Sequence, residues 1–249
     1  MSLHEFWTKW KGKLDDSLRK RGIAGTARVA AALAKRTLIE RCHPWNAWNP
    51  LYRYLDKRFD RKRGVDTAGL FRLPELESDP RFKYSEVYDP TPAAIFSRLM
   101  RRINVDLSRF VFIDFGCGKG KVLLLAAELP FKQIIGVELS SKLMQVAEEN
   151  LRSHLSRTRT VGNPIRLACM DASEFQLPRE ATICYFYNPF KEEVMRKVLE
   201  NIRRSLAAVP RELYVLYLYP IHHALFEESR FLTPVKKTAW YAIYKASCA

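Results

Sequence analysis

The sequence has no long apolar run that could cross a membrane. Its longest weakly charged stretch, residues 23–39, is interrupted by Arg28, Lys35 and Arg36, whereas a spanning helix needs about 20 mostly apolar residues. The opening residues place charge and bulky aromatic side chains where a secretory signal needs a continuous apolar stretch. We therefore expect a cytoplasmic protein with no membrane span.

Cysteine is scarce, and its spacing excludes several kinds of site. The five cysteines are odd in number and never form the Cys-x-x-Cys pair of a metal or redox centre: Cys42, Cys117, Cys169, Cys184 and Cys248. We interpret them as reduced and structural, Cys117 as a small side chain tolerated in its loop, and we expect no metal site.

Acidic residues are in short supply near the N-terminus. The formal net charge is +15, and residues 1–66 hold 16 Lys and Arg against 7 Asp and Glu. Such a segment can attract nucleic acid, an anionic membrane or an acidic protein, and a solvated helical face is the alternative. The apolar spacing of Leu3, Phe6, Trp7, Trp10 and Leu14 predicts an amphipathic basic helix, which either packs on the domain or lies on a membrane surface. Further helices are expected over residues 26–41 and 52–63.

From residue 110 onward, apolar strands alternate with helical patterns. Strands are expected over 110–115, 133–138, 165–169, 182–187 and 212–219, and helices over 121–129, 141–155 and 191–206. Residues 238–245 alternate aromatic and small side chains, which predicts an added antiparallel strand. Because the strands are almost continuously apolar, the pattern favours an α/β fold with a parallel sheet covered on both faces.

The segment Tyr88-Asp89-Pro90-Thr91-Pro92 precedes this alternation. Thr91 can cap a helix and Pro92 suits its first turn, so a helix is expected over residues 92–103. Residues 64–87, which contain prolines and scattered acids, read as a linker or lid. We therefore expect two parts, a basic helical segment over residues 1–87 and a catalytic domain over 88–249.

The turn after the first strand of the alternation reads Asp114-Phe-Gly-Cys-Gly-Lys-Gly120 and should lie at the carboxyl end of the sheet, where open α/β folds bind ligands. Its third glycine comes one residue too early for the dinucleotide fingerprint. A Walker loop also fails, because Val122 follows Lys121 where Ser or Thr is required. The spacing therefore disfavours nucleotide hydrolysis.

This turn resembles motif I of class I methyltransferases, Asp-x-Gly-x-Gly-x-Gly. The resemblance covers about residues 88–245 and implies a Rossmann-like, doubly wound sheet of seven strands, mostly parallel, with S-adenosylmethionine as methyl donor. It further implies that the cofactor's methionine portion is wrapped by the loop residues Asp114, Phe115, Gly116, Cys117, Gly118 and Gly120.

Two further acids match the same family. Glu138 ends the next strand, where an acid can bind both ribose hydroxyls, although such an acid is often only a helix cap. Asp171 and Ala172 resemble the family's adenine-contacting step, and an ordinary turn aspartate is the alternative.

The resemblance also implies substrate-facing residues. Asn188-Pro189-Phe190 is similar to the Asn-Pro-Pro-Tyr/Phe motif of amino-group methyltransferases, with one proline missing; in that motif the Asn oxygen accepts a hydrogen bond from the target amine. A strand-to-helix turn is the alternative. The step containing Tyr88 and Thr91 resembles a segment of seven-strand protein-lysine methyltransferases, including histone-lysine enzymes of the Dot1 type. It implies Thr91 near the cofactor's carboxylate. The candidates for orienting a target amine are Asn188, the backbone carbonyl of Tyr187, and Tyr88.

Three functions follow from these patterns. The first is methyl transfer to an amine of a protein or small molecule, for which the enzyme mainly aligns and desolvates the reactants. The second is methylation of RNA or DNA, consistent with the basic N-terminal segment and with enzymes that use an Asn-Pro turn against a flipped base. The third is a binding module that has lost catalysis.

Overall fold

The computed structural model describes residues 22, 50–72, 79–157 and 163–246. By its contacts the chain divides into two units, residues 1–49 and residues 50–249. The helices expected around Leu3 to Leu14 and over 26–41 lie outside the described residues.

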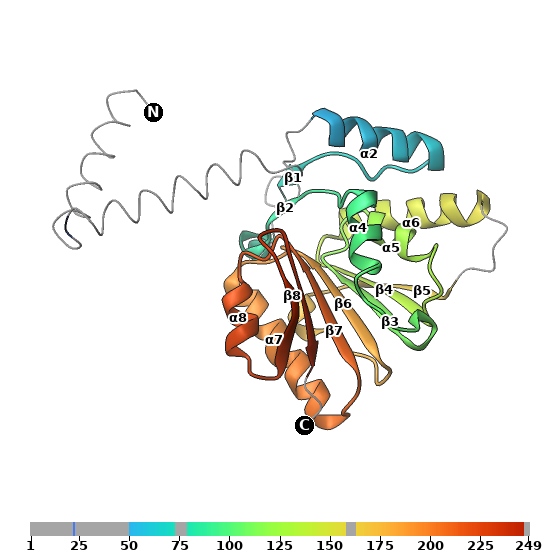
Figure 1. Ribbon diagram of the computed structural model, residues 1–249. Coiled ribbons are helices and arrows are strands. Elements are labelled where there is room, and N and C mark those ends of the chain that lie inside the picture. Colours follow the sequence, from blue (N-terminus) through green and yellow to red (C-terminus); the bar gives the residue numbers. More distant parts are fainter. Residues whose placement is uncertain (1–21, 23–49, 73–78, 158–162, 247–249) are drawn as a thin grey trace. The chain divides into compact units, whose positions relative to one another are not determined.

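The second unit contains a seven-stranded sheet in the order β5-β4-β3-β6-β7-β9-β8 (Figure 1). Its strands are β3 (Val111–Phe115), β4 (Gln133–Glu138), β5 (Ile165–Cys169), β6 (Thr182–Tyr187), β7 (Leu213–Leu218), β8 (Leu232–Lys237) and β9 (Tyr241–Ala246). The pairs among β3 to β7 are parallel, whereas β9 runs antiparallel to β7 and β8. The expected mostly parallel seven-strand sheet with an antiparallel C-terminal strand is confirmed.

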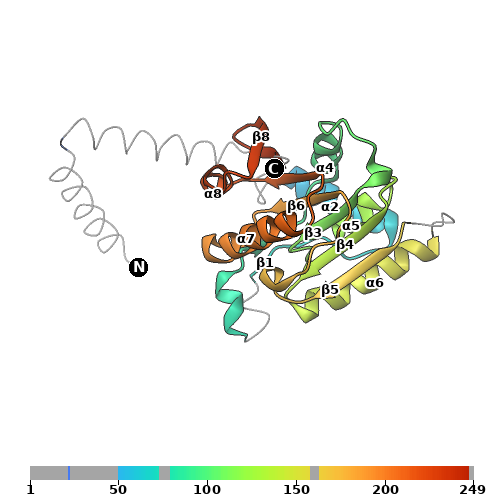
Figure 2. The same ribbon diagram turned by 90° about the horizontal axis from the view of Figure 1, so that it is seen from below.

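Helices cover both faces of the sheet (Figure 2). Helices α5 (Lys121–Ala126) and α6 (Ser141–Arg157) pack on the face formed by β3, β4 and β5, with α4 (Ala93–Met100) beside α5. On the other face, α7 (Glu192–Ala208) and α8 (His223–Glu228) contribute side chains to one core cluster with β3, β6 and β7. This burial on both faces is why β3 and β7 have no exposed residue, in agreement with their continuous apolar sequences.

Side chains of β3 alternate between the two faces. Val111, Ile113 and Phe115 join the cluster under α7, while Phe112 packs edge-on to Phe96 of α4, with ring centroids 5.8 Å apart. Asp114 shares the second face at the carboxyl end of the strand. The strand period of two therefore directs a carboxylate toward the same side as α4 and α5.

The expectation that Thr91 caps the next helix is wrong. The cap of α4 is Pro92, which makes no side-chain capping bond, and the Thr91 hydroxyl shares a 2.8 Å hydrogen bond with the hydroxyl of Tyr185. Thr91 is buried, so the bond ties the loop before α4 to strand β6. The helix is also shorter than expected, since it ends at Met100.

The segment expected to be a linker or lid contains short elements. Helix α2 (Pro50–Arg63) confirms the predicted helix over 52–63, and β1 (Phe71–Arg72) pairs with β2 (Val87–Tyr88). The 3₁₀ helix η1 (Pro80–Tyr84) buries Phe82 and lies between these strands in sequence. The described part of residues 50–87 therefore belongs to the same unit as the sheet.

Candidate functional site

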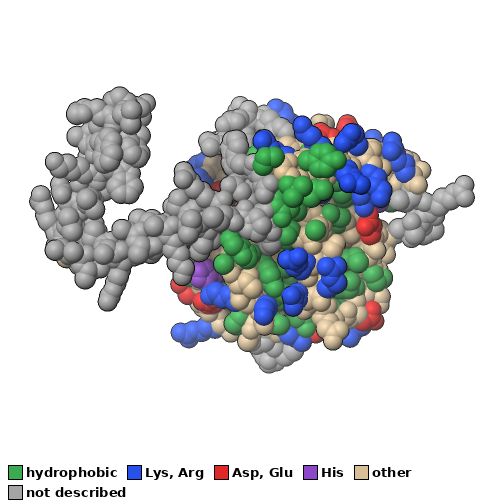
Figure 3. Space-filling view, turned by 45° about the horizontal axis from the view of Figure 1, so that its top comes forward, with side chains coloured by type: hydrophobic (Ala, Val, Ile, Leu, Met, Phe, Trp, Pro, Cys, Tyr) green, Lys and Arg blue, Asp and Glu red, His purple; other side chains and the backbone are tan. Residues whose placement is uncertain are grey.

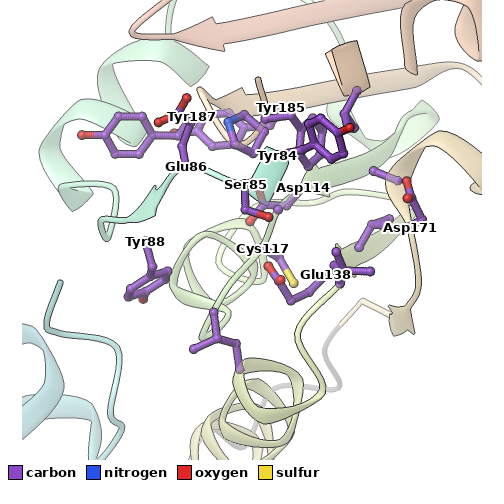
Figure 4. A pocket seen from close by; sticks show the side chains of 18 of the residues that line it. Tyr84, Ser85, Glu86, Tyr88, Asp114, Cys117, Glu138, Asp171, Tyr185 and Tyr187 are labelled. Atoms are coloured by element: carbon purple, nitrogen blue, oxygen red, sulfur yellow. The ribbon is translucent and has the colours of Figure 1, made fainter. Parts of the chain in front are cut away.

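A cavity of about 290 Å³ opens at the carboxyl ends of the parallel strands (Figure 4). Asp114 of β3, Glu138 of β4, Asp171 after β5 and Tyr187 of β6 all line it. Strand order reverses around β3, because the chain adds β4 on one side and β6 on the other. The cavity thus lies at the switch point where open α/β sheets bind ligands.

Most of the residues predicted for the site line this cavity: Tyr88, Thr91, Asp114, Gly116, Cys117, Glu138, Asp171, Ala172, Pro189 and Phe190. Four others, Phe115, Gly118, Gly120 and Asn188, are not among its lining residues. The ring of Phe115 stacks on Phe186 in the core, with centroids 4.9 Å apart.

The glycine loop after β3 is closely packed against two neighbouring segments. Gly116 and Gly118 have φ angles of 78° and 52°, which L side chains rarely adopt. A Cβ atom at Gly118 would lie 2.2 Å from the Tyr88 ring, and one at Gly116 would lie 2.5 Å from Pro189. Backbone freedom and close approach therefore both require glycine at these positions.

Glu138 holds this loop from the neighbouring strand. Its Oε2 accepts a hydrogen bond from the Gly118 N–H at 2.9 Å, and its Oε1 accepts one from the Ser140 N–H, also at 2.9 Å. The carboxylate is 5% exposed and lines the cavity. Glu138 therefore both fixes the loop and presents carboxylate to a ligand.

Asp171 has two roles in the structure. Its Oδ1 accepts hydrogen bonds from the Ser173 N–H at 2.8 Å and the Ser173 hydroxyl at 2.7 Å, which caps the 3₁₀ helix η3 (Ala172–Glu174). It also lines the cavity on the side of Glu138. Asp171 thus caps η3, and its place in the lining still allows it to contact a ligand.

Asn188 turns away from the cavity. Its Oδ1 accepts a 3.0 Å hydrogen bond from the Tyr217 hydroxyl, its φ is 40°, and it is 8% exposed. Pro189 and Phe190 do line the cavity. Backbone hydrogen bonds tie their turn to the end of η1 and the residues after it: the Glu86 N–H donates to the Pro189 carbonyl at 3.2 Å and the Lys191 N–H to the Tyr84 carbonyl at 2.8 Å.

Residues 56–68 form a cap on the glycine loop. The sequence does not predict this contact. The Lys119 Nζ lies 2.8 Å from Asp66 Oδ1, and the buried Lys121 pairs with Asp56 of α2. Burial raises the pKa of Asp56, although Lys121 opposes this shift. Both lysines of the Gly-Lys-Gly-Lys sequence therefore attach the loop to the cap.

Other contacts secure the cap. The Tyr88 hydroxyl donates to the Thr67 carbonyl at 2.7 Å, and the Asn150 side chain bonds the backbone of Asp66 and Lys119. Asp60 accepts three hydrogen bonds from residues 67 and 68. These partners are 7 to 84 residues apart in sequence, and no local pattern marks them.

The cavity contains a contact that the sequence does not predict. The Tyr187 hydroxyl donates a 2.7 Å hydrogen bond to Oδ2 of Asp89. Both residues line the cavity, and burial raises the pKa of Asp89 to about 6. Asp89 lies inside the Tyr88–Pro92 segment that the sequence singled out, but only the fold brings Tyr187 to it.

Residues 112–208 match the family described as Methyltransferase domain. The chain contains a methyltransferase domain. The match begins in β3 and ends with α7, so it includes the glycine loop, Glu138, Asp171 and the Asn188 turn. The family resemblance read from motif I is confirmed, and S-adenosylmethionine is the cofactor of this class of enzyme.

Solved structures with a similar chain path are more distant. They include a candidate RNA methyltransferase from Pyrococcus horikoshii (20% identity, TM-score 0.46, covering 64% of this chain and 85% of that chain). Others are the ribosomal protein L11 methylase of Lactobacillus delbrueckii subsp. bulgaricus (15%, 0.45, 69% and 84%) and the precorrin-6y C5,15-methyltransferase of Geobacter metallireducens GS-15 (15%, 0.42, 63% and 87%). A search of curated proteins gave no match. These likenesses do not indicate the methyl acceptor.

The cavity of the methyltransferase domain suits a cationic cofactor. Burial, and secondarily the charge of Glu138, raises the pKa of Asp114 well above its usual range. A buried acid in that position gains stability when a positive ligand neutralises it. Burial likewise raises the pKa of Cys117, which makes its thiol unreactive.

Proposed function

We propose that the domain transfers a methyl group from S-adenosylmethionine to an amine nitrogen. Glu138 would hold the ribose hydroxyls through its remaining lone pairs, and the backbone of the glycine loop would wrap the methionine portion. Thr91 and Asp114 would lie near the methionine carboxylate and ammonium, and Asp171 with Ala172 near the adenine.

The observation that carries the amine assignment is the charge of the cavity lining. Six acids line it: Glu86, Asp89, Asp114, Glu138, Asp171 and Glu193. Three cations line it. Arg81 and Lys121 are ion-paired with Asp79 and Asp56 outside the lining, and Lys197 pairs with Glu193 within it, so the lining keeps an excess of acids. Such a lining attracts an ammonium group and repels a phosphate or carboxylate.

The bound cofactor supplies a methyl group on a positively charged sulfur. The protein's own residues exclude water and align the acceptor, since Pro189, Phe190 and Tyr88 form apolar walls of the cavity. The Asn188 side chain is hydrogen-bonded to Tyr217. In this proposal the acids of the lining therefore contact the acceptor amine. We also propose that the acceptor is a protein or small molecule met in the cytoplasm.

Label transfer tests this proposal. Purified protein, cell extract and methyl-labelled S-adenosylmethionine should yield label in the protein or small-molecule fraction, as acid-stable N-methyl groups. The Gly118→Arg variant should transfer none. Label confined to nucleic acid, or present only as base-labile methyl esters, would contradict an amine acceptor.

A nucleic-acid acceptor is the second candidate, and the outer face of α2 favours it. Arg53, Lys57, Arg58, Arg61 and Lys62 are exposed, whereas the acids of the helix, Asp56 and Asp60, point inward. Figure 3, which turns the α2 side toward the viewer, shows several Lys and Arg side chains on this face and few acids. A row of cations of this kind suits a phosphate backbone.

Charge removal separates the two candidates. Changing Arg58, Arg61 and Lys62 to Gln should lower RNA affinity and flatten its salt dependence by about three charges if this face binds nucleic acid. The matched control changes Arg196, Arg203 and Arg204 of α7, which are exposed too. Equal RNA binding by both variants would remove the nucleic-acid candidate.

A further inference from the structure

One carboxyl group in the cavity is positioned by a hydroxyl and is otherwise open to a ligand. Asp89 lies in the loop between β2 and α4, and Tyr187 ends β6 directly before the Asn188 turn. Within the described part of the chain, the Tyr187 hydroxyl at 2.7 Å is the one hydrogen-bond partner of the Asp89 side chain. The second carboxylate oxygen therefore remains available in the cavity.

No described cation forms an ion pair with Asp89. Lys121 attracts it from a distance, but Lys121 is already bound to Asp56, and the Asp56 carboxylate itself acts against ionisation of Asp89. A carboxylate that is largely removed from water and lacks a cation gains most from a positively charged ligand. Among the described residues, Asp89 is thus a carboxylate without a counter-ion, in a cavity that admits a ligand.

Aromatic side chains surround this part of the cavity: Tyr84, Tyr88, Tyr185, Tyr187 and Phe190. The hydroxyls of Tyr88, Tyr185 and Tyr187 are bound to Thr67, Thr91 and Asp89, so these residues offer mainly ring surface to a ligand. Aromatic rings attract ammonium groups, and they tolerate methyl substituents on the nitrogen. In Figure 4, Tyr187 and Glu86 lie toward one side of the cavity, and Glu138 and Asp171 toward the other. An acceptor site on the Tyr187 side therefore lies apart from Glu138 and Asp171, the predicted ribose and adenine contacts.

We propose that Asp89, positioned by Tyr187, binds the ammonium group of an alkylamine acceptor and removes its proton. This inference rests on the proposed amine function and names its substrate class: a primary alkylamine of the kind carried by a lysine side chain, rather than an aromatic base nitrogen.

The alkylammonium gives one proton to the Asp89 carboxylate, which leaves a neutral amine beside a neutral acid. The amine lone pair forms the new N–CH3 bond as the S–CH3 bond breaks, and the electron pair of that bond stays on sulfur. The product nitrogen carries the positive charge, and the proton on Asp89 leaves to water. Because an ion pair becomes a neutral pair, burial assists the proton transfer.

Binding of a simple amine tests the assignment without an identified substrate. We would saturate the protein with S-adenosylhomocysteine and titrate it with n-butylamine hydrochloride by calorimetry. Wild-type protein should bind the amine at about tenfold or more higher affinity than Asp89→Asn, since a buried charged hydrogen bond is lost. Both should bind S-adenosylhomocysteine within about twofold of each other. The matched control is Asp106→Asn, an exposed acid before the opposite end of β3.

The pH dependence of amine binding distinguishes direct binding by Asp89 from a purely structural role of this residue. The groups that interact with Asp89 are Tyr187 of β6, Asp56 of α2, Lys121 of α5, and Tyr88 and Tyr185. Glu86 lines the same cavity. Because the pKa of Asp89 is about 6, the affinity for butylammonium should rise about tenfold between pH 5 and pH 7.5. The same titration of Asp89→Asn should be flat, and Tyr187→Phe should shift the midpoint upward, because the hydroxyl that stabilises the carboxylate is removed.

The outcomes distinguish this inference from the function on which it rests. Equal butylamine binding by wild type and Asp89→Asn, or a parallel loss of S-adenosylhomocysteine affinity, overturns the role of Asp89 while amine methylation stands. If label transfer instead reaches only nucleic acid and wild type binds no butylamine, the proposed function fails together with the inference.

Discussion

Replacing Asp89 with Asn should stabilise the protein at neutral pH, although Asp89 is proposed to act in the reaction. Its pKa is raised from 3.8 to about 6 by burial, so the folded state holds the proton more tightly than the unfolded state. Folding stability then falls as pH rises between these two values, and the loss is complete above about pH 6. At 1.36 kcal/mol per pKa unit, the ionised carboxylate costs about 3 kcal/mol.

Asparagine removes this penalty and keeps an oxygen that can accept the bond from Tyr187. The free energy of unfolding of Asp89→Asn, measured by urea denaturation, should exceed that of wild type by about 3 kcal/mol at pH 7.5 and by about 1 kcal/mol at pH 4.5. Asp106→Asn, at an exposed turn, is the control for the substitution itself. A gain that is equal at both pH values, or a loss at pH 7.5, would refute the burial of an unpaired Asp89 carboxylate.

Three further substitutions probe the rest of the site. Gly118→Ala should weaken S-adenosylhomocysteine binding on the order of a hundredfold in calorimetry, because the added Cβ would collide with the Tyr88 ring. The control Gly64→Ala should retain binding, because the atoms nearest its Cβ belong to the flexible Arg157 side chain. Asp56→Asn should lower the free energy of unfolding by about 3 kcal/mol, because Lys121 is left buried and unpaired, whereas Glu192→Gln breaks an exposed pair with Arg196 and should cost less than about 1 kcal/mol. Glu138→Gln should reduce S-adenosylhomocysteine affinity about tenfold or more, since one anionic acceptor for both the loop and the ribose is lost; an equal affinity would remove Glu138 from the cofactor site.

The sheet was predictable because its central strands are buried on both faces. The expected ranges 133–138 and 182–187 coincide with β4 and β6, since a continuous apolar run bounded by polar residues is typical of a strand buried on both faces. The range 165–169 also coincides with β5, although this edge strand is only partly buried and contains the exposed Arg166. Helix α7 also began within one residue of its expected start. The residue pattern of these elements is therefore sufficient to locate them.

Two elements near the C-terminus were not predicted. Strand β8 exposes five of its six residues and contains Pro234 and two lysines, which is typical of a protected edge strand and gives no alternating pattern. Helix α8 has six residues, too few for a helical period to show. Their positions depend on pairing with β9 and on packing against the core rather than on local pattern.

The lining of the cavity was predictable where one loop forms it, and not where it depends on contacts between distant segments. The glycine turn and Glu138 lie in fixed order along one βαβ unit. Tyr187 and Asp89, by contrast, are 98 residues apart, and Asp56 and Lys121 are 65 apart. Thr91 failed as a helix cap for the same reason: its partner, Tyr185, is 94 residues away.

The contrast between an acidic cavity and a basic α2 face restricts how each candidate acceptor could bind. A nucleic acid would have to keep its phosphates on the exposed cations of α2 and insert only a neutral base past Glu86 and Asp89. Its methylation would then depend steeply on salt and on α2 charge. A lysine side chain needs no such separation, because its charge matches the lining and its alkyl chain suits the aromatic walls. Methyl transfer that persists at high salt in the α2 charge variant is therefore the behaviour expected of an amine acceptor.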